Sequence, residues 1–292
     1  MTEQPIILGA DASRVGVLAL PDEIPVDPAR PVLLLLNAGL VHRVGPHRLY
    51  VNVARHLARQ GFASLRFDFS GIGDSLPRSD SLPYRESTLA ETTQAMDMLA
   101  ERLGARRFCL AGLSSGALVS MAAAGDPRVA GVALLNPHGF AESAELGAHV
   151  AQQSQGRIYA QNLFRFDSWL RLVSGKTDYR RLGRALAYRL RPRRDGQVDT
   201  VAAEARQELL AFFGLPKYIL LLLSEQDRSL DNFSEILGPR WQQQLGGHVE
   251  TVVLPHANHT FAGPVHGRQA VEAMERWMLA HWDRETRGCS GD

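Results

Sequence analysis

A serine flanked by two glycines at fixed spacing is the strongest candidate for chemistry in this sequence. Gly112, Ser114 and Gly116 form a Gly-x-Ser-x-Gly pattern that follows the apolar residues 108–111 and precedes helix-forming residues at 117–124. In such a strand-to-helix turn, the nucleophile elbow, the middle residue is held in a strained backbone conformation that exposes its hydroxyl. The glycines leave room for strand and helix to approach. The rival interpretation is a serine that only caps the helix.

A candidate acid and two candidate bases follow this serine along the chain. Asp227 stands just after the apolar run 218–224, and His256 and His259 come later. A serine hydroxyl is a poor nucleophile at neutral pH, so a neutral imidazole must take its proton and a carboxylate must orient that imidazole. We predict Asp227 as the acid, rather than the competing Asp231, because Asp227 lies at the end of a predicted strand. With both partners present, the serine is expected to be a nucleophile.

The elements that must position these residues alternate between strand and helix. Residues 6–8 and 15–20 predict an antiparallel entry hairpin. Further strands are predicted at 32–36, 63–68, 108–111, 129–135, 218–224 and 249–254, and helical patterns at 49–60, 86–103, 117–124, 233–245 and 265–282. Such alternation predicts an α/β fold with a mostly parallel sheet, helices on both faces, and functional loops at the carboxyl ends of the strands.

The alternation stops in the middle of the chain. Between residues 140 and 215 we find no good strand candidate, only helical stretches such as 144–153 and 201–213. We therefore divide the chain into a first core part (1–139), a helical cap insertion (140–215) and a second core part (216–292).

Across essentially its whole length the sequence resembles the α/β-hydrolase superfamily. Ser114, Asp227 and His259 stand in that superfamily's chain order of nucleophile, acid and base. The resemblance favours His259 over His256, because residues 259–261 match the family pattern. It implies an α/β-hydrolase fold with an inserted helical cap. Three segments also resemble, more narrowly, hydrolases associated with exosortase A systems and serine-aminopeptidase-like hydrolases: 43–48, 65–75 and 169–176.

The resemblance also implies an oxyanion hole made of two backbone N–H groups. One belongs to Ser115, directly after the nucleophile, and the other to the loop after the strand at 32–36. We assign the second to Leu40. Gly39 is the alternative, because without a His-Gly pair the frame can slip by one residue.

Several loop residues at the same end of the sheet are candidates for substrate contact. Asn37, Gly39 and His138 are our choices, while His42 and His47 are interpreted as ordinary polar loop residues. The histidines lack the spacing of a metal site, so we expect no metal, and we expect no cofactor.

The sequence contains no complete nucleotide-binding motif, and the chemistry that its residues support is acyl transfer to serine. Gly71-Ile72-Gly73 lacks the third glycine of a dinucleotide site, since Leu76 stands in its place, and no phosphate-binding loop is found. Serine rather than aspartate at the elbow argues against dehalogenase or epoxide-hydrolase chemistry. We therefore predict a serine hydrolase that cleaves an ester or thioester through an acyl-serine intermediate. An acyltransferase using the same acyl-enzyme, a peptidase, and a non-catalytic binding protein of this fold are the alternatives.

Composition and apolar run length indicate the size of the core and the expected location of the protein. The 292 residues are 45% hydrophobic, enough for a large core, and Cys109 and Cys289 do not suggest a disulfide framework. No apolar run reaches membrane-spanning length and no leader is evident, so we expect a cytoplasmic protein with no membrane span and no nucleic-acid partner.

The predicted cap is strongly basic. Residues 157–194 hold eleven arginines and lysines against Asp167 and Asp178, in a chain whose net charge is +1. One interpretation is a solvated helical face. The other is that this surface recruits an anionic substrate, such as an acyl group on coenzyme A or on an acyl carrier protein, because clustered charge raises the local concentration of an oppositely charged partner.

Overall fold

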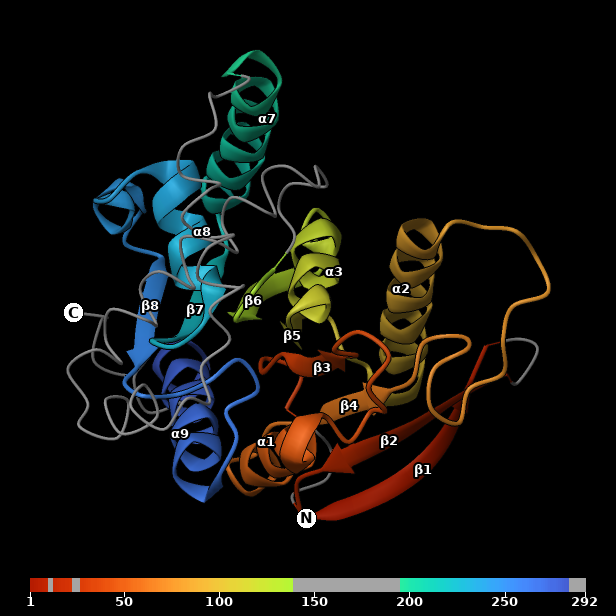
Figure 1. Cartoon of the computed structure of the whole chain (residues 1–292). Helices are drawn as coiled ribbons and strands as arrows, with labels where there is room; N and C mark the ends of the chain where they lie inside the picture. Colours follow the sequence, from red (N-terminus) through yellow and green to blue (C-terminus); the bar gives the residue numbers. More distant parts are fainter. Residues whose placement is uncertain (10–12, 23–26, 139–194, 284–292) are drawn as a thin grey trace, which may run out of the picture.

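A central β-sheet organises the computed structural model, which describes residues 1–9, 13–22, 27–138 and 195–283 (Figure 1). The described strands form one eight-stranded sheet in the order β1-β2-β4-β3-β5-β6-β7-β8. They are β1 (Thr2–Leu8), β2 (Arg14–Leu20), β3 (Val32–Leu36), β4 (Ser64–Phe67), β5 (Phe108–Leu113), β6 (Val129–Leu135), β7 (Tyr218–Ser224) and β8 (Val249–Leu254). β1 pairs antiparallel with β2, and β2 with β4. All other neighbouring pairs are parallel.

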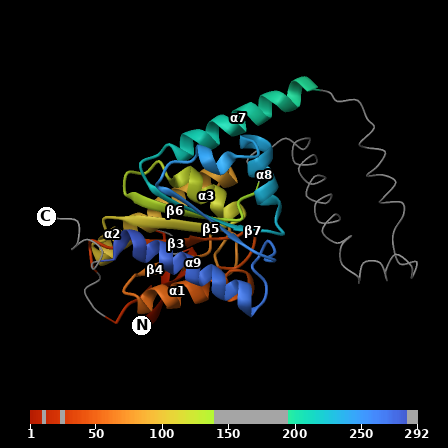
Figure 2. The same ribbon diagram turned by 90° about the vertical axis from the view of Figure 1, so that its left-hand side faces the viewer.

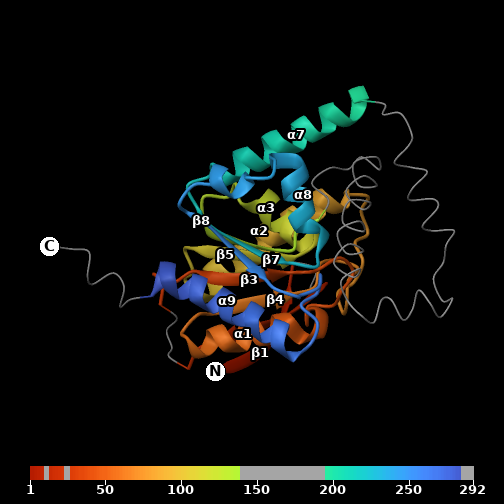
Figure 3. The same cartoon turned by 60° about the vertical axis from the view of Figure 1, so that its left-hand side comes forward.

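Helices cover both faces of this sheet. They are α1 (Leu49–Arg59), α2 (Tyr84–Leu103), α3 (Ser115–Ala123), α7 (Asp195–Phe213), α8 (Arg228–Leu237) and α9 (Pro264–Trp282), with short 3-10 turns η1 (Pro46–Arg48) and η2 (Trp241–Gln244). Helices α1 and α9 lie together on one face, and α2, α3, α7 and α8 lie on the other (Figures 2 and 3). No helix in the described part of the chain is long and apolar enough to span a membrane.

Strand β3 shows why the sequence folds into this layered arrangement. Every one of its five residues is apolar and buried. Val32, Leu34 and Leu36 pack with side chains of α2 and α3, whereas Leu33 and Leu35 pack with α1 and α9. A strand covered on both faces needs such a continuous apolar run, because successive side chains point to opposite sides.

The parallel register gathers the functional loops at one edge of the sheet. Leu36 at the end of β3 lies opposite Gly112 of β5, and Leu113 lies opposite Leu135 at the end of β6. Leu135 in turn lies opposite Leu222 near the end of β7. The segments that follow β3, β5, β6 and β7 therefore emerge side by side.

Most predicted elements are confirmed, and one helix was placed wrongly. The helix expected at 233–245 begins earlier, at Arg228, and ends at Leu237. Gly238 has φ 95°, a value that favours glycine and lies outside the helical region, and Pro239 cannot donate a helical hydrogen bond. The chain resumes only as the short turn η2.

The predicted cap lies mostly outside the described residues. The helix expected at 201–213 is confirmed as the carboxyl-terminal part of α7. The helix expected at 144–153 and the basic residues of 157–194 fall in the segment 139–194, which the structure does not describe. The division into two core parts and a cap stays a prediction.

Candidate active site

Ser114 occupies the sharp turn between β5 and α3. Its backbone has φ 59° and ψ −119°, a conformation that residues other than glycine rarely adopt. The turn is fixed by two backbone hydrogen bonds: Ser114 N donates to Leu135 O at 2.9 Å, and Ala117 N donates to Ser114 O at 3.1 Å. The Ser114 side chain makes no capping hydrogen bond to α3. The hydroxyl is thus held at the strand end without serving as a helix cap.

The two flanking glycines are required by close backbone contacts. A Cβ atom on Gly112 would lie 2.2 Å from the carbonyl carbon of Gly116. A Cβ atom on Gly116 would lie 2.6 Å from the carbonyl oxygens of Leu36 and Asn37. Strand β5, helix α3 and the end of β3 can therefore approach this closely only when both positions lack a side chain.

Tyr50 of α1 holds the ends of β3 and β5 together beneath the elbow. Its buried hydroxyl donates to Leu36 O at 2.8 Å and accepts from Leu113 N at 2.8 Å. Burial raises the pKa of Tyr50 above its ordinary value, so the phenol stays protonated and can donate. This role of Tyr50 has no signal in the sequence, since a tyrosine on the apolar face of a helix is indistinguishable from a core residue.

The predicted acid and base meet at the carboxyl ends of β7 and β8. Asp227 Oδ2 lies 2.8 Å from His259 Nδ1. Asp227 is buried at the N-terminus of α8, where its Oδ1 accepts from the backbone N of Ser229 at 2.9 Å and from Ser229 Oγ at 2.6 Å. Burial alone would raise the pKa of Asp227, but hydrogen bonds from His138, His259 and Ser229 hold it well below its usual range. The carboxyl group is therefore ionised at neutral pH.

The competing histidine points elsewhere. The side chain of His256 is 81% exposed and lies near Glu225, with its Nδ1 3.4 Å from Glu225 Oε2. The backbone N of His256 donates to the same oxygen at 2.8 Å. Of these two histidines, His259 is the one that contacts Asp227, with the two atoms 2.8 Å apart. The catalytic roles themselves stay predictions.

Asn136, directly after β6, joins the acid loop to the base loop. Its side-chain Nδ2 donates to the backbone O of His259 at 2.9 Å and to Ser224 Oγ at 2.8 Å. Its Oδ1 accepts from Ser224 N at 2.7 Å, and the residue is fully buried. Because the preceding Leu135 O accepts from Ser114 N, this dipeptide connects the nucleophile turn to the His259 loop. In the sequence, the sign of this bridging role is a polar amide that directly follows an apolar strand.

His138 lies beside the acid–base pair. Its Nε2 is 3.1 Å from His259 Nδ1 and 3.1 Å from Asp227 Oδ1. The two imidazole rings meet edge to face, with centroids 4.5 Å apart. We predicted a substrate contact at His138. The structure instead directs its Nε2 towards Asp227 and His259.

The loop after β3 presents a different backbone donor from the one we assigned. The N–H of Gly39 donates to Ser115 Oγ at 2.7 Å, so it points at the elbow. Gly39 has φ 57°, in a turn closed by a hydrogen bond from Val41 N to Ala38 O at 3.1 Å. The Leu40 side chain is 85% exposed. Because its N–H faces the elbow, Gly39, the alternative, is our candidate for the second oxyanion donor, and the role stays a prediction.

The buried side chain of Asn37 stabilises this loop through hydrogen bonds and is not accessible to substrate. Its Nδ2 donates to Val41 O at 2.8 Å and to Asp68 Oδ1 at 3.0 Å, and its Oδ1 accepts from Phe69 N at 2.8 Å. The residue is only 1% exposed. The predicted substrate contact by Asn37 is corrected accordingly: every polar atom of this amide is engaged inside the protein.

Two sets of side chains in the described part of the chain come close enough to hold a metal ion. One is His42, Asp68 and Asp74, and the other is His138, Asp227 and His259. The first set already surrounds a cation, because the guanidinium of Arg43 contacts Asp68 and lies 2.8 Å from Asp74. Only the second set is free of such an internal cation among the described residues.

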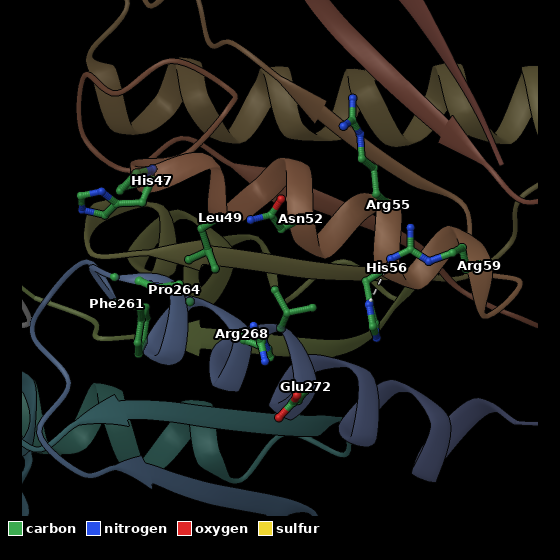
Figure 4. A pocket seen from close by; sticks show the side chains of 14 residues that line it. His47, Leu49, Asn52, Arg55, His56, Arg59, Phe261, Pro264, Arg268 and Glu272 are labelled. Atoms are coloured by element: carbon green, nitrogen blue, oxygen red, sulfur yellow. Dashed lines mark hydrogen bonds between the residues drawn. The ribbon is translucent and has the colours of Figure 1, made fainter.

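A separate hollow of about 730 Å³ lies between α1 and α9 (Figure 4). Its lining includes His47, Asn52, Arg59, Phe261 and Arg268, and it excludes all three predicted catalytic residues. One end adjoins the base loop, because His47 Nε2 lies 3.1 Å from the hydroxyl of Thr260. This hollow is therefore a neighbour of the catalytic cluster and is not the cluster itself.

Comparison with known proteins identifies the family to which the fold corresponds. Residues 33–274 match the family model described as the alpha/beta hydrolase family. No match is found among curated proteins. The narrower resemblance to exosortase-associated hydrolases stays a prediction.

Three solved structures illustrate the likeness. An alpha-beta serine hydrolase homologue from Coxiella burnetii is 14% identical, with 94% of this chain and 97% of that chain covered and a TM-score of 0.55. The esterase PF2001 from Pyrococcus furiosus is 14% identical, with 96% and 91% covered and a TM-score of 0.58. A proline iminopeptidase from Mycobacterium smegmatis is 16% identical, with 96% and 100% covered and a TM-score of 0.56. At these identities the likeness concerns the fold.

Proposed function

This chain belongs to the alpha/beta hydrolase family and is a hydrolase, and we propose that it cleaves an ester or thioester through an acyl-serine intermediate on Ser114. The observation that carries the proposal is the 2.8 Å contact between Asp227 Oδ2 and His259 Nδ1. Ser114, which comes earlier in the chain, has the elbow conformation. Asp227 and His259 supply the acid–base pair that a serine nucleophile needs.

The first half of the reaction forms the acyl-enzyme. Asp227 accepts a hydrogen bond from the Nδ1–H of His259, which leaves Nε2 with a lone pair as the general base. Nε2 takes the proton of Ser114 while Oγ attacks the substrate carbonyl. The tetrahedral oxyanion is stabilised by the backbone N–H groups of Ser115 and Gly39. When the carbonyl re-forms, the bond to the leaving alcohol or thiol breaks, and His259 returns the proton to it.

The second half releases the acid. Water replaces the leaving group and attacks the acyl carbonyl while His259 removes one of its protons, and the same donors stabilise the second tetrahedral intermediate. The bond to Ser114 Oγ then breaks, His259 returns the proton to Oγ, and the acid leaves. If an alcohol or amine takes the place of water, the identical acyl-enzyme performs acyl transfer. The basic run at 157–194 supports an anionic substrate, such as an acyl group carried on coenzyme A or an acyl carrier protein, by charge complementarity.

A substrate panel with one shared acyl group tests the proposal. We expect turnover of an oxygen ester and a thioester, with slower or no turnover of the matched amide and aminoacyl amide. An aminoacyl amide cleaved faster than the ester would identify a peptidase, and product that appears only with an added alcohol or amine would identify an acyltransferase. No turnover and no covalent acyl-protein with any member would favour the non-catalytic alternative.

A further inference from the structure

The catalytic cluster contains one imidazole more than a serine triad uses. His138 Nε2 approaches His259 Nδ1 at 3.1 Å and Asp227 Oδ1 at 3.1 Å. If Nε2 carries a proton, it can donate to Asp227 Oδ1 while His259 donates to Oδ2. If it does not, its lone pair faces Nδ1 of His259. In either protonation state, three possible metal-ligand atoms lie within 4.8 Å of one another.

The spacing of these atoms suits a tetrahedral metal ion. Ligands 2.0–2.1 Å from a zinc ion lie about 3.3 Å from one another in an ideal tetrahedron. The corresponding separations are 3.1 Å between the two nitrogens, 2.8 Å from His259 Nδ1 to Asp227 Oδ2, and 3.4 Å from His138 Nε2 to Asp227 Oδ2. Small shifts of the side chains would bring all three atoms to bonding distance of one ion.

The chemistry of the ligands points in the same direction. Two imidazoles and a carboxylate are a set that zinc prefers when a fourth position remains for water. Asp227 is oriented by Ser229, which donates to its Oδ1 from both backbone N and Oγ. Such outer hydrogen bonds fix a ligating carboxylate in place. The backbone of His259 is likewise held, by Asn136.

We propose that His138, Asp227 and His259 form a Zn²⁺-binding site and that zinc bound there reversibly inhibits the enzyme. Zinc bound to Nδ1 of His259 takes the place of the proton through which Nδ1 donates to Asp227, so the neutral ring carries its one proton on Nε2. That nitrogen can then no longer accept the Ser114 proton. Zinc binding itself requires no catalytic activity, whereas the inhibition rests on the proposed serine mechanism.

The experiment measures binding and inhibition separately. Zn²⁺ is titrated calorimetrically into Ser114→Ala protein, which keeps all three ligands, and Co²⁺ is added as a spectroscopic probe. We expect one ion per chain and the intense visible absorption of tetrahedral Co²⁺. His138→Ala and His138→Gln should weaken binding at least about tenfold. His256→Ala, which removes an exposed histidine from the same loop, should leave it unchanged.

Activity assays complete the test. Zn²⁺ should inhibit the wild-type enzyme with a constant that matches the calorimetric one, and EDTA should restore the rate. Equal affinity in wild type and a folded His138 variant, or the weak spectrum of octahedral Co²⁺, would overturn the site. Tight binding at His138 without inhibition would overturn the inhibitory role. Zinc binding in a protein with no hydrolytic turnover would leave the site standing and refute the proposed function.

Discussion

Removal of the Tyr50 hydroxyl tests how the nucleophile turn is held. In Tyr50→Phe, Leu36 O loses a donor and Leu113 N loses an acceptor, each at 2.8 Å in the parent structure. Both partners lie in the buried core. A buried polar backbone group left without a partner costs about 1–3 kcal/mol. We therefore expect Tyr50→Phe to lower the free energy of unfolding by roughly 2–6 kcal/mol, because two such groups are orphaned.

Urea denaturation measures this change, with Tyr218→Phe as the matched control. Tyr218 lies at the surface, 40% exposed, and its ring stacks on His281. The control should stay within about 0.5 kcal/mol of wild type. The Tyr50 variant should also show a lower kcat, because its hydroxyl joins the residue before the nucleophile to the strand before the oxyanion loop. A loss no larger than the control's would refute our view that this hydroxyl braces the elbow.

Three further predictions concern the base, the elbow and acid stability. His259→Ala should reduce kcat roughly 10⁴-fold or more, and His256→Ala should leave kcat nearly unchanged; steady-state kinetics showing equal losses would reverse the assignment. Gly116→Ala should destabilise the protein by at least about 1–3 kcal/mol, since its Cβ would overlap backbone oxygens, and a wild-type denaturation midpoint would contradict the packing argument. The hydrogen bond from Arg55 lowers the pKa of Glu3, so Glu3 stabilises the folded state at neutral pH and this contribution is lost as pH falls through the folded pKa. Glu3→Gln should therefore be less stable than wild type near pH 7 and converge with it in acid, and parallel stability curves would count against the ion pair.

Local patterns in the sequence were enough to predict much of this fold. The strands at 32–36, 129–135 and 218–224 have the predicted bounds, because continuous apolar runs mark buried parallel strands. The strand at 249–254, at the edge of the sheet, also has the predicted bounds. The elbow was predictable because its two glycines stand at a fixed spacing that close backbone contacts require. The misplaced helix α8 reflects competition between helical periodicity and Gly238-Pro239, which ends the helix after Leu237.

The supporting contacts of the site could not be predicted, because they join residues far apart in the chain. Asn136 bonds to a residue 123 positions away, and Tyr50 to one 63 positions away. Neither residue type carries a motif at those separations. The choice between Leu40 and Gly39 was open for a related reason: the direction of a backbone N–H in a loop depends on the turn conformation.

The central claim is a covalent intermediate on Ser114, and one measurement tests it most directly. Wild-type protein and the variants Ser114→Ala and Ser115→Ala are treated with a fluorophosphonate probe, and the modified peptide is identified by mass spectrometry. We predict stoichiometric labelling at Ser114 in wild type, retained labelling in Ser115→Ala, and none in Ser114→Ala, with hydrolysis lost in parallel. A label on another residue, or wild-type turnover in Ser114→Ala, would contradict the acyl-serine mechanism.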